Sequence, residues 1–424
     1  MKKIFKALLF SIIFLPAIVL LYGCNEQPPG PTPLTLTSSM LSLEYETTTY
    51  NGREHKPTVK VTAQGHTFDA TEFATYENNI EVGTATLTLN LTKGNSYVKA
   101  GTATKEFTIE EKVIEVSSLQ QLNNAINQTD SNHIIKLTKD ITSNVAANGY
   151  IQPVLICPES KHLDDVTIDL NNHTIKTEVW IVKEYYENSG IIGGSGKFHI
   201  TDNTANITLF NGNIGAENAD RPVDGVDYGI ILKVANGFNV TLNNIKSFGK
   251  SAGIYSNGQS KFSGNSVINA TNCSFSGLQS NDNAGAYLAS NITTNFENCS
   301  FTGYTAYYTK SGTHNLTNNS FVANGAGYIK PTIFSGNGFN CNGSAIVVDS
   351  SQGYTNHLVL NLYNSDFFVR SAKAFQIDEV TTYKVNGSVE AYSQINVFVS
   401  SLDEVENFNV QTQNNRINFI VNER

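Results

Sequence analysis

The sequence is poor in charged residues, which make up 15% of its 424 positions. Beyond the first six residues it has no cluster of Lys or Arg, and its net charge is -9. Proteins that bind nucleic acid carry a basic surface that neutralises the phosphates. Nucleic acid is therefore not expected as a partner.

The sequence also lacks the short motifs of common catalytic sites. It has no Gly-x-Ser-x-Gly, His-Glu-x-x-His or Walker-type stretch, and its eight His are scattered. The Cys residues after position 24 show no Cys-x-x-Cys spacing, which gives metal binding little support. Their disulfide state stays open, because spacing alone does not pair them: Cys157, Cys273, Cys299 and Cys341.

Small and polar residues are abundant instead. The chain has 32 Gly and many Asn, Thr and Ser, while apolar residues make up 40% of it. This composition disfavours helices and favours strands that are joined by tight turns. The sequence predicts an all-β protein.

The N-terminus has the layout of an export signal. Three Lys precede an apolar run from residue 7 to 21, and "LYGC" follows at 21–24. This stretch resembles the signal of bacterial lipoproteins, in which cleavage before the Cys exposes a thiol that takes a diacylglycerol. The resemblance implies a signal peptide over 1–23 and lipidation of Cys24. The alternative is a secretory peptide or membrane anchor with an incidental Cys.

Residues 24–33 include a Pro-rich polar stretch of the kind that holds a domain away from a surface. Together with the lipid anchor, this tether predicts an extracytoplasmic protein at the bacterial cell surface. The lipid anchor is the expected contact with the membrane.

Residues 34–112 alternate in polarity as strands do, with turn signals such as Asn51-Gly52 between them. The stretches "YNGREHKPTVKV" and "YENNIEVGTATLTL" resemble a bacterial immunoglobulin-like module that is found in tandem on surface proteins. The resemblance implies a small β-sandwich that acts as a spacer.

A phrase with Asn, a small residue and Phe recurs from about residue 166 onward, for example "INATNCSFSG" at 268–277. The recurring Asn residues are spaced 33, 28, 26 and 20 positions apart: Asn211, Asn244, Asn272, Asn298 and Asn318. A second phrase, a small residue followed by a strand, alternates with the first, as in "GAYLA" from Gly285. Repeats of this length without helical periodicity indicate a solenoid with three strands in each turn.

The sequence therefore predicts a right-handed, single-stranded parallel β-helix of about ten coils over residues 113–424. An amphipathic helix at 117–128 is expected to cap its first coil. Each recurring Asn is expected at a sharp bend, bonded to its equivalent about 4.8 Å away on the next coil, with the following Phe inside. Cys273 and Cys299 occupy matching positions and are expected to stack as small apolar residues, although a disulfide between them stays an alternative.

The segment from "SSLQQLNNAIN" to "ITLFNGNI" (117–214) resembles the opening coils of the pectate-lyase-like superfamily, especially its surface and adhesin-like members. This superfamily contains lyases, hydrolases, epimerases and binding proteins, so the resemblance implies the fold but leaves the activity open. In its enzymes the sugar chain lies along the outer face of the first strand of each coil.

We therefore examine which residues of that strand point outward. If the residue after each Gly or Ala points inward, the next one points outward, and this column contains no carboxylate: Ile231, Tyr255, Tyr287, Tyr308, Ile329, Val347 and Gln376. Two places further along lies Lys310. Exposed aromatic rings stack on sugars, so Tyr255, Tyr287, Tyr308 and Lys310 are predicted to bind a ligand. In the alternative register the Tyr rings are buried in the core.

The stretch 215–229 carries several acidic residues, among them Asp220, Asp224 and Asp227. Oxygen ligands this close together are able to hold calcium, but the spacing differs from the Asp-x-Asp-x-Asp-Gly pattern. A solvated loop is the preferred interpretation, and no cofactor is expected.

The first functional hypothesis is an adhesin-like protein that binds a glycan, a host ligand or another cell-surface partner without turnover. An enzyme that acts on acidic glycans, a polysaccharide lyase or glycoside hydrolase, is the second hypothesis. A structural cell-surface protein is the third.

Overall fold

In the computed structural model the chain forms two compact units. The first comprises the chain up to residue 48 with 54–79 and 83–108, and the second comprises 49–53, 80–82 and the chain from 109 onward. Among the described residues, no helix has the length and apolar character needed to cross a bilayer. The structure describes residues 30–127, 133–143, 151–156, 165–182, 205–218, 221–222, 226–233, 238–257, 266–277, 283–324, 345–349, 358–369, 375–378, 383–385, 388–390, 393–399 and 417–421.

The first unit consists of short strands around a shared apolar core. Every second residue of its longer strands is buried, for example Leu87 and Leu89, as the alternation of polarity predicts. The immunoglobulin-like resemblance of this unit stays a prediction. One sheet contains β1 (Leu41–Leu43), β3 (Val59–Ala63) and β4 (His66–Asp69), the other contains β2 (Thr47–Thr49), β7 (Gly101–Glu110), β6 (Gly83–Leu91) and β5 (Ala74–Glu77), and two 3-10 turns are η1 (Ser38–Met40) and η2 (Thr71–Phe73).

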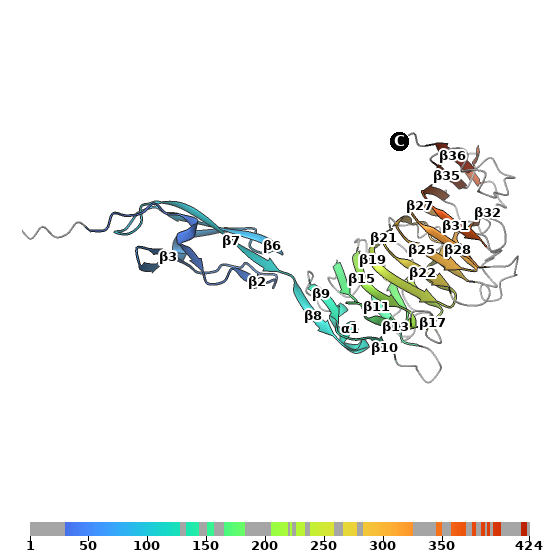
Figure 1. Ribbon diagram of the computed structural model, residues 1–424, viewed down its shortest axis with the longest axis horizontal. Helices are drawn as coiled ribbons and strands as arrows, with labels where there is room; N and C mark the ends of the chain where they lie inside the picture. Colours follow the sequence, from blue (N-terminus) through green and yellow to red (C-terminus); the bar gives the residue numbers. More distant parts are fainter. Residues whose placement is uncertain are drawn as a thin grey trace, which may run out of the picture. The chain divides into compact units, whose positions relative to one another are not determined.

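The second unit winds three strands into each coil, and each strand pairs with the equivalent strands of the coils before and after it. Thus β23 (Ala284–Leu288), β24 (Thr293–Glu297) and β25 (Ser300–Gly303) pair in parallel with β26 (Thr305–Thr309), β27 (Gly312–Thr317) and β28 (Ser320–Ala323). The coils stack as successive rungs (Figure 1). The predicted fold, an all-β parallel β-helix, is confirmed.

The first strands of the coils form an eight-stranded parallel sheet, and the second and third strands belong to one seventeen-stranded sheet. The eight-stranded sheet contains β11 (Val154–Ile156), β14 (Val179–Val182), β18 (Tyr228–Lys233), β20 (Ala252–Asn257), β23, β26, β29 (Ile346–Asp349) and β32 (Phe375–Asp378). The seventeen-stranded sheet contains β8 (Lys112–Val116), β9 (His133–Leu137), β10 (Ile141–Thr142), β12 (Asp165–Asp169), β13 (Thr174–Lys176), β15 (Ala205–Ile214), β19 (Phe238–Gly249), β21 (Val267–Thr271), β22 (Ser274–Gly277), β24, β25, β27, β28, β30 (Leu358–Tyr363), β31 (Asp366–Val369), β35 (Ser393–Val399) and β36 (Ile417–Val421). Two small hairpins pair β16 (Ala216–Asn218) with β17 (Arg221–Pro222) and β33 (Tyr383–Val385) with β34 (Ser388–Glu390).

The recurring Asn residues lie at the corner between the second and third strands of each coil. All five predicted ones have a positive φ between 53° and 59°, and Asn364 has a φ of 44°. Asn tolerates this left-handed conformation better than most residues, because its short side chain bonds locally. The predicted bond between corner residues of adjacent coils is seen from Asn244 Nδ2 to Asn211 Oδ1, at 3.3 Å.

The interior of the coils is a continuous apolar core. Three Phe side chains stack along it, with ring centroids 5.5 Å apart between Phe275 and Phe301 and 5.2 Å apart between Phe301 and Phe321. All three are fully buried, as predicted.

The predicted capping helix is α1 (Leu119–Ile126). Ser118 is its N-cap and accepts a hydrogen bond from the Gln121 backbone N at 3.2 Å, which satisfies one of the free N–H groups of the first turn. Its apolar face, including Leu122 and Ile126, packs into the core of the coils. The helix therefore covers apolar side chains of the first coils.

Candidate functional site

The predicted aromatic column lies on the outer side of the eight-stranded sheet. Tyr255, Tyr287 and Tyr308 are register partners on β20, β23 and β26. Their neighbours along the chain, Ile254 and Ala286, belong to the core inside the coils, whereas the three Tyr belong to a separate cluster. The predicted register is therefore right, and the inverted register is wrong.

The three Tyr rings are nevertheless buried. The exposed fractions of Tyr255, Tyr287 and Tyr308 are 7%, 2% and 0%. The Tyr287 ring has Tyr255 on one side at 5.1 Å and Tyr308 on the other at 5.0 Å, and Tyr228 adds a further ring at 4.2 Å from Tyr255. Because stacked neighbours cover the flat faces of the rings, the prediction of an exposed aromatic strip is wrong. Ligand binding by these residues stays a prediction.

Lys310 is also buried, with 1% of its area exposed. Its Nζ lies 5.8 Å from the ring centroids of both Tyr287 and Tyr308. At this distance the ammonium group is attracted to the electron-rich ring faces. Lys310 thus lies buried against the Tyr column and is not open to solvent, and its binding of a ligand stays a prediction.

The predicted acidic loop is only partly covered by the structure. Asp220 and Asp224 lie outside the described residues. Asp227 directly precedes β18, and its side chain is exposed. Among the residues that the structure describes, no three His, Cys, Asp or Glu side chains come together as a metal site would require.

Glu178, which the sequence pattern did not indicate, anchors the chain around Asp227 through hydrogen bonds. Its carboxylate accepts hydrogen bonds from the backbone N of Asp227 at 3.0 Å, the backbone N of Tyr228 at 3.1 Å and the indole N–H of Trp180. Burial raises the pKa of Glu178, although these three bonds act in the opposite direction. Loss of solvation also raises the pKa of Asp227, and the charge of Lys250 opposes this shift.

Two of the Cys residues can be placed. Cys273 and Cys299 are free thiols that face the interior in adjacent coils, with 3% and 2% of their area exposed. The hydrogen bond with the neighbouring Cys273 thiol and burial raise the pKa of Cys299, so the thiol stays protonated. The expectation that this pair stacks as small apolar residues agrees with their burial. Cys24, Cys157 and Cys341 lie outside the described residues.

A buried polar cluster surrounds His314 inside the coils. The ring Nδ1 lies 2.9 Å from Thr294 Oγ1 and 2.8 Å from Tyr307 Oη, and Nε2 lies 2.8 Å from Thr309 Oγ1 and 2.9 Å from the Ser311 carbonyl oxygen. Because a carbonyl oxygen only accepts, Nε2 carries the proton and Nδ1 accepts from a hydroxyl. Burial lowers the pKa of His314 to about 4, so the ring is neutral near pH 7.

The clearest accessible feature lies on the outer side of the second strands of the coils. We call it the Asn-Thr face and define it by the outward residues of β15, β19, β21, β24, β27 and β30. Thirteen of its eighteen positions are Asn or Thr, and Glu297 is the only one of the eighteen that carries a charge. Its three columns are Asn206, Asn239, Val267, Thr293, Thr313 and Val359; Thr208, Thr241, Asn269, Asn295, Asn315 and Asn361; and Phe210, Asn243, Thr271, Glu297, Thr317 and Tyr363.

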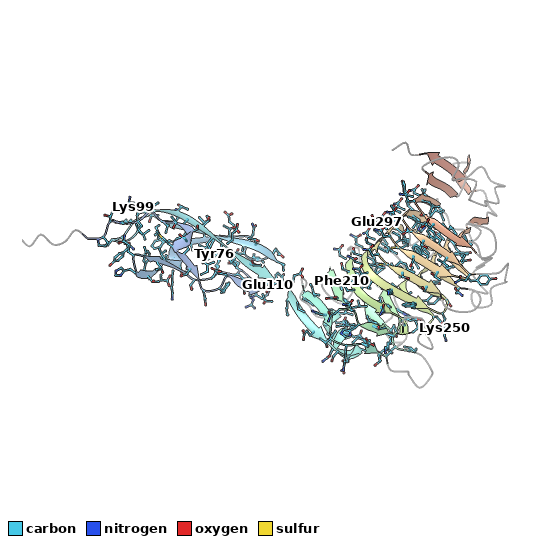
Figure 2. The ribbon with its side chains drawn as sticks, in the orientation of Figure 1. Tyr76, Lys99, Glu110, Phe210, Lys250 and Glu297 are labelled. Carbon is cyan, nitrogen blue, oxygen red and sulfur yellow. The ribbon has the colours of Figure 1, made fainter. Side chains whose placement is uncertain are left out.

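A ladder of amides runs along the middle column of this face. Asn295 Nδ2 donates to Asn269 Oδ1 at 2.8 Å, Asn315 Nδ2 donates to Asn295 Oδ1 at 2.9 Å, and Asn361 Nδ2 donates to Asn315 Oδ1 at 2.8 Å. The Asn295 side chain is exposed, and the other three are half-buried. Figure 2 labels Phe210 and Glu297, which lie along the same side of the stack, away from Lys250.

The sequence does carry a signal for this ladder, which the analysis of repeats missed. Each ladder residue from β21 to β30 lies three positions before a corner Asn, in "NATN", "NFEN", "NLTN" and "NLYN". The corner residue and the strand residue of this pattern therefore form two separate columns of Asn.

The comparisons with known proteins add no relative. No protein-family model matches the chain, and no curated protein sequence is significantly similar to it.

Proposed function

We propose that this chain is a surface-anchored bacterial lipoprotein whose β-helix binds a glycan or another cell-surface ligand without turnover, as adhesin-like proteins do. In this proposal a lipid on Cys24 holds the chain at the membrane, outside the cytoplasm. Residues 34–112 form an immunoglobulin-like spacer. The coils belong to the surface members of the pectate-lyase-like superfamily.

The observation that carries the proposal is the Asn-Thr face. Sugars are recognised through many uncharged hydrogen-bond donors and acceptors, which amides and hydroxyls supply. Thirteen such side chains lie on one accessible surface of six coils, with a single carboxylate among them. The two flanking aromatic side chains, Phe210 and Tyr363, are half-buried and add apolar surface of the kind on which sugar rings pack.

A glycan array that is probed with the full chain in detergent tests this function. We expect binding to one class of glycan, with the glycan recovered unchanged after prolonged incubation. If no glycan on the array binds, carbohydrate binding is refuted, and a protein ligand on a cell surface is left.

One observation favours the lyase or hydrolase as a second candidate. Glu178 and Asp227 both have raised pKa values and lie together at the N-terminal ends of β14 and β18, with Lys250 near Asp227. Carboxyl groups with raised pKa values are suited to proton transfer. However, the Glu178 carboxylate already accepts three hydrogen bonds, two of which hold the start of β18, and this is a structural role.

Incubation with a panel of uronans distinguishes this candidate. Unsaturated products that absorb in the ultraviolet, or new reducing ends, would establish an enzyme. Loss of that activity in Glu178→Gln would assign it to this cluster. We expect neither product.

A further inference from the structure

We infer that the Asn-Thr face binds a neutral, extended polysaccharide whose chain axis runs along the stack of coils, across the strands. This inference rests on the proposed function and names its ligand class, its residues and its direction. It departs from the aromatic column of the eight-stranded sheet, whose rings are buried.

The hydrogen-bonding capacity of the ladder amides supports this inference. A primary amide has two N–H donors and a carbonyl oxygen with two lone pairs. In Asn295 the ladder uses one N–H toward Asn269 and one lone pair for Asn315. The ladder therefore fixes the orientation of the amide while half of its capacity is not used by its neighbours in the ladder. Fixed, partly engaged amides are suited to sugar hydroxyls, because little side-chain entropy is lost on binding.

The direction and length of the ladder suit an extended ligand chain. Adjacent parallel strands lie about 4.8 Å apart, so the four ladder amides span about 14 Å, and the six coils of the face span about 24 Å. The ladder is straight because each amide bonds to its register partner on the next coil. A polymer that lies along this line meets an equivalent amide at each of the four ladder coils, and a Thr hydroxyl at the equivalent positions of β15 and β19. An extended chain keeps this contact, whereas a coiled chain leaves the surface.

The charge of the Asn-Thr face disfavours polyanionic ligands. Among the eighteen positions Glu297 is the only acidic residue, and no Lys or Arg occupies the face. A polyanionic chain such as a uronan would meet a carboxylate and no compensating cation. Charge complementarity therefore selects a neutral polymer, and its binding should depend only weakly on salt.

The test measures the affinity of the full chain for oligosaccharides of increasing length by calorimetry. The probes are extended neutral β-1,4-linked glucose and mannose oligomers, coiled neutral α-1,4-linked glucose oligomers, and acidic oligogalacturonates. We expect affinity for an extended neutral series to rise steadily up to about the hexamer and to change by less than about twofold with added salt. Preference for the acidic series, or no gain with length, would overturn the inference.

A set of variants locates the site. The triple variant Asn269→Ala, Asn295→Ala and Asn315→Ala should weaken binding at least about tenfold, which corresponds to about 1.4 kcal/mol. Its matched control replaces three outward Ser residues of the third strands, Ser274, Ser300 and Ser320, by Ala, and should bind as the natural chain does. Asn295→Lys, at an exposed position, provides a second obstruction that is not expected to disturb folding.

The outcomes separate the inference from the proposed function. If a glycan binds and none of the ladder variants weakens it, the Asn-Thr face is not the site, while the proposed function stands. If no glycan binds the natural chain, the inference fails together with the carbohydrate-binding part of the proposed function.

Discussion

The buried His314 predicts how the stability of the β-helix depends on pH. Its imidazole is fully enclosed, and its polar neighbours Thr294, Tyr307, Thr309 and the Ser311 carbonyl carry no charge. Burial raises the pKa of Tyr307, so this phenol stays neutral throughout the acidic range. A proton added to His314 would therefore place an uncompensated charge in the core.

The direction and size of this pH effect on stability follow from the difference in the pKa of His314 between the folded and unfolded chain. Burial lowers the pKa of His314 from 6.5 to about 4, so the unfolded chain binds this proton more readily than the folded one. The neutral ring contributes its full stability above pH 6.5, and this contribution is lost as the pH falls toward 4. The complete loss is on the order of 3 kcal/mol, and about 2 kcal/mol of it is already lost near pH 5.

The assay is urea denaturation between about pH 5 and pH 7.5, followed by the fluorescence of Trp180. This is the only Trp in the chain and it lies in the second unit, so its signal reports on the β-helix. His314→Gln is the matched variant, because it keeps a donor and an acceptor but does not titrate. Carboxylates and the other His residues contribute equally to both proteins. As the pH falls over this range, we expect the free energy of unfolding to decrease by about 2 kcal/mol more in the natural chain than in the variant. If the free energy of unfolding depends on pH equally in the two proteins, the reasoning is refuted.

Two further predictions concern the coils themselves. Phe301→Ala should lower the free energy of unfolding of the second unit by about 3–5 kcal/mol, because it opens a cavity between Phe275 and Phe321. The same denaturation assay measures this loss. A loss below about 1 kcal/mol would contradict a close-packed interior. Asn298→Gly should be nearly neutral, whereas Asn298→Val should cost about 1–2 kcal/mol or more, because φ is 54° at this corner. Equal stability of these two variants would show that the corner does not demand a left-handed residue.

The repeat in the sequence was sufficient to predict the coils because its elements are local. A corner Asn must adopt a positive φ, and a Phe a few residues later must point inward, whatever the rest of the chain does. The alternation after each small residue likewise fixed the direction of Tyr287 and Tyr308. Strand periodicity determines which side of a sheet a residue lies on.

Whether an outward residue reaches solvent is not a local property. The two faces of the Tyr287 ring are covered because equivalent rings lie on the coils before and after it. Outward direction alone therefore does not predict exposure, and the aromatic column is buried although it points outward. The ladder of strand Asn residues was missed for a different reason. The corner Asn three positions later accounts for the repeat by itself, so the repeat does not require the column of Asn residues in the strands.

The two columns of Asn differ in what the backbone requires. At the corner, a positive φ restricts the choice to Asn, Asp or Gly, so those residues need no functional explanation. In the strands no such constraint exists, and Asn is among the residues that strands disfavour, whereas Thr or Val would suit the same exposed positions. The chain places Thr at the equivalent positions of β15 and β19 and then changes to Asn at the register partners on β21, β24, β27, β30, β35 and β36. The hydrogen bonds of the ladder offset part of the low strand propensity of Asn, but a column of Thr would avoid this penalty altogether. The residues that folding explains least are therefore those on which the proposed binding depends most.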